Sequence, residues 1–122
     1  MKLFLVLGAL GAALAVALGA FGAHGLKARL SSEMLAVWQT AVQYHAWHAL
    51  GLLAVGFLSP SIWSKVAGGL LAAGIVLFSG SLYALALGAP RFFGAVTPFG
   101  GLAFILGWLA FAVGVIYART PA

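Results

Sequence analysis

The segment at residues 43–48 reads QYHAWH and places two histidines, a tyrosine and a glutamine in a run, 41–58, that is otherwise hydrophobic enough to cross a membrane. Imidazole changes its charge near neutral pH and ligates metals, so these histidines suit proton transfer or metal binding. At about 100° per helical residue, Tyr44, His45 and His48 fall within about 100° of one another. Because a polar side chain facing lipid is costly, this face is predicted to point toward protein or water.

Other polar residues are predicted to gather in the same half of the membrane. His24 closes the first hydrophobic segment, and the third segment returns to that side with Ser79, Ser81 and Tyr83 in its last turns. Thr97 precedes the fourth segment on the same side. The candidate ligand-binding residues are therefore His24, Tyr44, His45, His48, Ser79, Ser81, Tyr83 and Thr97.

A metal site is one hypothesis for this cluster. His24, His45 and His48 would supply three nitrogen ligands, enough for zinc or copper. The His-x-x-His spacing is not a recognised ligand pair, however, and Glu33 is the only acidic residue in the sequence. A second hypothesis is a transporter or channel-like protein for protons or metal ions. Such proteins usually carry an intramembrane carboxylate or paired charges, and the hydrophobic segments hold neither.

A structural role is a third hypothesis. Polar side chains in membrane helices form hydrogen bonds across helices that are worth on the order of 1 kcal/mol per pair. In such a network, His48 is expected to bond to Ser79 or Ser81, and Tyr44 to a backbone carbonyl.

Binding of a lipid headgroup or a quinone is the fourth hypothesis. Lys27 and Arg91 lie on the same side and would supply contacts to an anion. Catalysis is not expected, because the chain has no aspartate for a Ser-His-Asp set and no phosphate-binding Gly-Lys-Ser/Thr motif. We therefore expect no enzyme activity and no cofactor.

The composition places these residues in an integral membrane protein. Of 122 residues, 65% are hydrophobic and only 6% are charged, and the mean hydropathy is +1.18. A soluble domain has about 25% charged residues, so this chain cannot cover a surface facing water. The net charge of +5 comes from cations spread over loops and ends, which indicates orientation determinants rather than nucleic-acid binding. No cysteine is present, which excludes disulfides and thiolate ligands.

Four segments reach the roughly 20 apolar residues that a membrane-spanning helix needs. The first is read as a retained helix, because its apolar core is longer than the 7–15 residues of a secretory signal. Ser31 or Ser32 is expected to cap the second helix, with Trp38 at the membrane interface. Residues 88–101 are expected to form a loop or a partly re-entrant segment. The prediction is one membrane domain over 1–122, an all-α antiparallel bundle of four transmembrane helices at 3–24, 32–58, 66–87 and 100–118.

Small residues recur every four positions along three of these helices. Such strips allow helices to approach closely in a membrane. They predict packing faces within the chain, and an interface in a homo-oligomer or with another membrane protein is left open. The strips are Gly11, Ala15, Gly19 and Ala23; Gly80, Ala84 and Gly88; and Ala110, Gly114 and Ala118.

The two sides of the membrane carry equal numbers of positive residues, so this count does not decide the orientation of the protein. We expect the termini in the cytoplasm, because Lys2 immediately precedes the first helix. Lys2, Lys65 and Arg119 lie on the side of the termini, and Lys27, Arg29 and Arg91 lie on the other.

Several motifs in order resemble one known family. They are GAFGAHGLK at 19–27, Tyr44 and the HAL of 48–50, FSGSLY at 78–83, TPFGG at 97–101, and GW at 107–108. The set resembles the small bacterial membrane protein family filed as domain of unknown function 423, the YgdD-like proteins. The resemblance covers nearly the whole chain and implies a multi-spanning protein of the bacterial inner membrane. The family has no established molecular function, so no catalytic residue is carried over.

The sequence as a whole predicts a non-enzymatic membrane protein that binds a partner or a small ligand through its polar cluster. The alternative is the proton or metal-ion transporter, which requires a continuous polar path across the membrane. The half of the membrane away from the cluster is almost purely leucine, alanine, valine, isoleucine and glycine, which predicts no such path.

Overall fold

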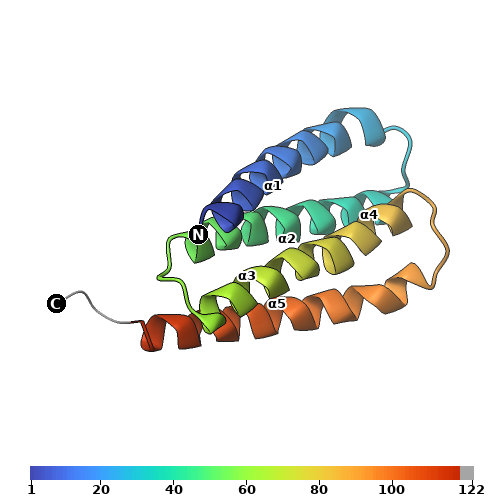
Figure 1. The fold of residues 1–122 in the computed structure, drawn as a ribbon. Coiled ribbons are helices and arrows are strands. Elements are labelled where there is room, and N and C mark those ends of the chain that lie inside the picture. Colours follow the sequence, from blue (N-terminus) through green and yellow to red (C-terminus); the bar gives the residue numbers. More distant parts are fainter. Residues whose placement is uncertain (119–122) are drawn as a thin grey trace.

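The computed structural model describes residues 1–118, and within them the chain is helical with no strand. Each helix runs antiparallel to the next along the chain, and short connections join them at alternate ends (Figure 1). The helices are α1 (Lys2–Phe21) continued by the π-helical turn η1 (Gly22–Leu26), α2 (Ser32–Gly56), a rod of α3 (Ile62–Gly74), η2 (Ile75–Ser79, π-helical) and α4 (Gly80–Ala86), and α5 (Phe93–Ile116).

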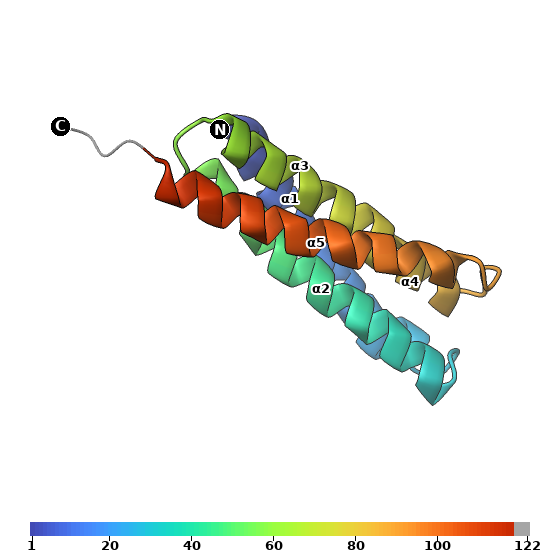
Figure 2. The same ribbon diagram turned by 90° about the horizontal axis from the view of Figure 1, so that it is seen from below.

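The helices form a flattened bundle in which α2 and the α3–α4 rod are the inner pair. α1 contacts chiefly α2, and α5 contacts chiefly α3, while α2 and the rod contact each other along their length. Figures 1 and 2 show α1 and α5 on opposite sides of this inner pair. Residues of α2 and of the rod are therefore the ones placed to meet between helices.

Capping residues determine where two of the helices begin. The side chain of Ser31 accepts a hydrogen bond from the backbone N–H of Met34 at 3.1 Å, which confirms the expected cap of α2. Ser61 and Ser64 form a reciprocal capping box at the start of α3. The third helix therefore begins at Ile62, four residues before the expected start.

The loop expected at 88–101 is limited to residues 88–92, and its expected extension to 101 was wrong. Gly88, at φ +100°, ends the preceding turn, and α5 begins at Phe93, seven residues before the expected start. Pro98 lies inside the helix and has no backbone N–H, so it cannot donate the helical hydrogen bond to the carbonyl of Gly94. Gly94 lies in the exposed first turn, so its carbonyl can be satisfied from outside the helix.

Most of the small-residue strips are used for packing within the chain. A Cβ atom added to Gly11 or Gly19 would lie 3.2 Å or 3.3 Å from side chains of α2, and Ala15 is buried. Gly114 of α5 likewise faces α3. Gly80 differs, because a Cβ atom there would meet nothing within 4 Å. The strip of the third helix is therefore not a packing face for this chain.

Three helical segments among the described residues are long and apolar enough to cross a membrane. They are Lys2–Leu26, Ile62–Ala86 and Phe93–Ile116. α2 is not among them, although it has 25 residues, because its polar side chains lower its hydropathy. Large apolar side chains are exposed along the outer surfaces of α1 and α5. The chain is thus an all-α integral membrane protein.

Candidate functional site

His45 is buried in the middle of the bundle. Its Nδ1 atom lies 2.9 Å from the hydroxyl of Tyr83, which belongs to α4, and the His45 side chain is only 3% exposed. A Cβ atom added to Gly11 of α1 would lie 4.0 Å from the other ring nitrogen, Nε2. His45 therefore faces α1 and α4 together, and it points toward protein as the helical spacing predicted.

Trp38 supports the partner of His45. Its ring lies 4.7 Å from the ring of Tyr83, and its Nε1–H donates to the carbonyl of Leu18 at 3.0 Å. Gly22 leaves room for this ring, because a Cβ atom there would lie 2.6 Å from it. The Trp38 side chain is 3% exposed and packs between α1 and α4, so it faces protein; its expected position at the membrane interface stays a prediction.

His48 points in a different direction from His45. Its ring stacks on Phe104 of α5 with centroids 3.5 Å apart, and its Nδ1 lies 2.6 Å from the backbone oxygen of Tyr44. The expected bond from His48 to Ser79 or Ser81 was therefore wrong. The ring of Tyr44 packs against Phe78 at 4.5 Å, so this residue enters an aromatic cluster. Phe78 and Phe104 were not among the predicted site residues, because an aromatic residue among other apolar residues carries no distinguishing signal.

The hydroxyl groups of the cluster bond to other partners. Ser79 is fully buried and donates to the carbonyl of Ala41 in α2 at 2.8 Å. Ser81 and Thr97 share a hydrogen bond that joins α4 to α5. These contacts tie the rod to the helices on both sides of it.

The three histidines expected as metal ligands are not brought together. His24 is exposed in η1, while His45 and His48 face different helices. Within residues 1–118, the structure holds no group of three or more His, Cys, Asp or Glu residues able to hold a metal ion. The zinc or copper site proposed from the sequence is not assembled in this fold.

A groove of about 290 Å³ lies beside His45 between α1 and the α3–η2 part of the rod. We call it the His45 groove. His45 is the only residue of its lining with a polar side chain, and Leu10 and Val76 are exposed at 65% and 69%. This groove could not be predicted from the sequence, because it depends on where α1 and the rod diverge. The groove is lined by Leu7, Leu10, Gly11, Leu14, His45, Leu52, Ala72, Ile75 and Val76.

The fold and its apolar helices define a small multi-helical membrane protein, and comparison with known proteins gives the family. The family model described as "Protein of unknown function (DUF423)" matches residues 18–101. The UPF0382 membrane protein YwdK of Bacillus subtilis is 51% identical over 120 residues, which cover 95% of this chain and 98% of that protein. The UPF0382 membrane protein SSP2132 of Staphylococcus saprophyticus is 54% identical over 116 residues, covering 93% and 97%. The chain belongs to the DUF423 family. No solved structure matches it.

Proposed function

We propose that the protein is a non-enzymatic binding protein for a neutral amphipathic molecule dissolved in the bilayer. The ligand's apolar body would occupy the His45 groove, and a carbonyl or hydroxyl group would bond to His45. The observation that carries this proposal is the position of His45, the single polar side chain in a groove with exposed apolar walls. An isoprenoid quinone or a lipid with an ester or alcohol group has the required chemistry.

The hydrogen bond with Tyr83 supports this role for His45. The Tyr83 hydroxyl engages Nδ1, and Nε2 faces the backbone of Gly11, so a ligand group would share or replace that backbone hydrogen bond at Nε2. A neutral imidazole donates from one nitrogen and accepts at the other, so Nε2 can serve a hydroxyl or a carbonyl. An anionic headgroup fits less well, because the walls are apolar and the cations Lys27 and Arg91 are exposed outside the groove lining.

The packing of the other half of the bundle supports binding over transport. Between His48 and the 59–65 connection, the space is filled by buried apolar side chains, among them Leu52, Val55 and Leu71. A transporter for protons or metal ions needs polar groups or water along its path. A ligand that enters the His45 groove from the bilayer does not need such a path.

We also infer that α2 crosses the membrane as a fourth span. Its 25 residues equal the length of Lys2–Leu26, and His45 and His48 are buried against neighbouring helices instead of facing lipid. The bilayer is taken to be the bacterial inner membrane, with the termini in the cytoplasm. Arg119, counted above for orientation, lies outside the described residues. Reporter fusions at the two sides of the bundle would test this topology.

Native mass spectrometry of protein extracted in a mild detergent tests the proposed function. The expected result is an adduct with the mass of a quinone or a lipid on the unaltered protein. Val76→Trp fills the mouth of the groove at an exposed position and should abolish the adduct. Leu77→Trp introduces the same side chain one residue further, outside the groove lining, and should retain it.

Three outcomes would contradict the proposed function. The first is bare protein in every sample, which would leave the cluster as a structural network. The second is an adduct that survives Val76→Trp unchanged, which would place the ligand elsewhere. The third is an adduct with the mass of a metal ion, which would contradict the assignment to an amphipathic molecule.

A further inference from the structure

The outward face of α2 is unusual for a helix in a membrane protein. The exposed residues along this face are Gln39, Gln43, Trp47 and Leu50, which follow one another at intervals of four, four and three. Residues with this spacing share one side of a helix. Two are apolar or amphipathic, with Trp47 53% and Leu50 57% exposed, and two carry amides, Gln39 and Gln43.

Gln43 lies near the middle of the 25-residue helix α2. With α2 crossing the membrane, as inferred above, its exposed amide lies within the hydrocarbon, in the half of the membrane that holds the polar cluster. No residue within 1–118 forms a hydrogen bond with the Gln43 side chain. Polar side chains at this depth almost always face protein or a water-filled cavity. The exposed amide therefore indicates a surface that another protein segment covers.

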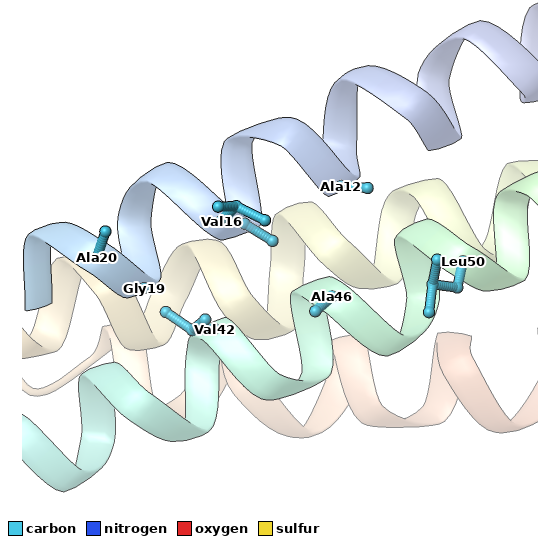
Figure 3. Close-up of a pocket in the computed structure, with 8 residues that line it drawn as sticks. Ala12, Val16, Gly19, Ala20, Val42, Ala46 and Leu50 are labelled. Carbon is cyan, nitrogen blue, oxygen red and sulfur yellow. The ribbon is translucent and has the colours of Figure 1, made fainter. Parts of the chain in front are cut away.

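An apolar groove lies directly beside this amide, between α1 and α2. We call it the outer groove; its volume is about 560 Å³, and small residues make up most of its walls. Figure 3 shows its labelled residues along the two helices, with Gly19 and Ala20 on α1 and Val42 and Ala46 on α2. A smaller hollow shares Gly19 and Val42 with it and reaches Gln39 and Gln43. Walls of small residues allow a further helix to approach closely.

We propose that a second copy of this chain covers this face, with α2 packed against α2 about a two-fold axis along the membrane normal. An amide carries both a donor and an acceptor, so two Gln43 side chains can satisfy each other. A two-fold axis brings the same residue of both copies together at the same depth. A lipid chain fills the outer groove equally well but leaves the amide without a partner.

Disulfide trapping in native membranes tests the dimer, and the absence of cysteine from the chain makes each introduced thiol unique. Gln39→Cys and Ala46→Cys flank Gln43 and keep it intact. Both should form covalent dimers under a mild oxidant. Ile105 lies near the middle of α5, which packs on the α3–α4 rod and not on α1, and it is 60% exposed, so Ile105→Cys should remain monomeric.

Gln43→Leu tests the amide itself and leaves the buried core unaltered. The dissociation constant of the dimer, measured by energy transfer between labelled copies in lipid vesicles, should rise about tenfold. Gln39→Leu, nearer the helix end, should change it less. Three results would each overturn the proposal. They are disulfide trapping by Ile105→Cys as strong as at the α2 positions, a monomeric unaltered protein in vesicles, and an unchanged dissociation constant for Gln43→Leu. Trapping only to a different protein would assign the face to another partner and overturn it too.

Discussion

The Nδ1 atom of His45 lies 2.9 Å from the hydroxyl of Tyr83, and the two residues are 38 positions apart in the chain. This contact joins the middle of α2 to the last helical part of the rod. Trp38 packs against the same tyrosine and binds the backbone of α1. Two hydrogen bonds and one aromatic contact thus connect three of the helices around the candidate site.

Removing the Tyr83 hydroxyl should destabilise the protein modestly. Tyr83→Phe keeps the ring that packs on Trp38 and removes only the bond to His45. Interhelical hydrogen bonds in membranes average about 0.6 kcal/mol, so we expect a loss of that order in the free energy of unfolding. Unfolding in mixed micelles, followed by tryptophan fluorescence, measures it. Tyr44→Phe is the matched control, and a loss as large as that of Tyr83→Phe would contradict this account.

Gly100 should tolerate no side chain. A Cβ atom there would lie 2.7 Å from the Cα atom of Phe78 and closer still to its backbone nitrogen, so a whole helix would have to move. We expect Gly100→Ala to cost about 3 kcal/mol or to prevent folding. Gly80→Ala is the control, because a Cβ atom there would meet nothing within 4 Å. It should leave stability unchanged or raise it by up to about 1 kcal/mol, and similar unfolding midpoints for the two variants would refute the close contact.

The start of α2 should depend on one serine of two neighbours. Ser31 accepts from the backbone N–H of Met34, whereas Ser32 is the first residue of the helix. Ser31→Ala should therefore cost about 1 kcal/mol, and Ser32→Ala less than about 0.5 kcal/mol. Hydrogen exchange of the first-turn amides of α2 distinguishes them, with faster exchange expected only for Ser31→Ala. The reverse order would place the cap at the second serine.

The all-α fold and the start of α2 could be predicted from the sequence because both depend on local signals. Long apolar segments and a capping serine act within one helix, without reference to the others. The start of α5 could not be predicted in this way. Pro98 and the glycines around it are typical of loops, yet Gly100 is the position at which α5 fits against Phe78. Tertiary packing decided the local structure there.

The candidate site was predicted in part for a similar reason. Helical periodicity indicated that His45 and His48 face protein, and both are buried. Periodicity could not predict which partners each histidine contacts. A small difference in helical angle places the His45 ring against α1 and α4 and the His48 ring against Phe104 of α5. The His45 groove depends on the spacing between helices, for which the sequence of any one helix has no signal.

The π-helical segment η2 has a consequence for how much the length of this chain can vary. Buried residues of α3 recur at intervals of three and four up to Gly74, and the next buried residue, Ser79, follows after five. The rod therefore contains one residue more than a regular helix would need to keep the same side inward. Deleting one residue there should therefore restore regular helical bonding and leave Ser79 and Tyr83 on the side that faces their partners. The length of the rod can thus change by one residue at η2 without turning the helix end that carries Ser79 and Tyr83.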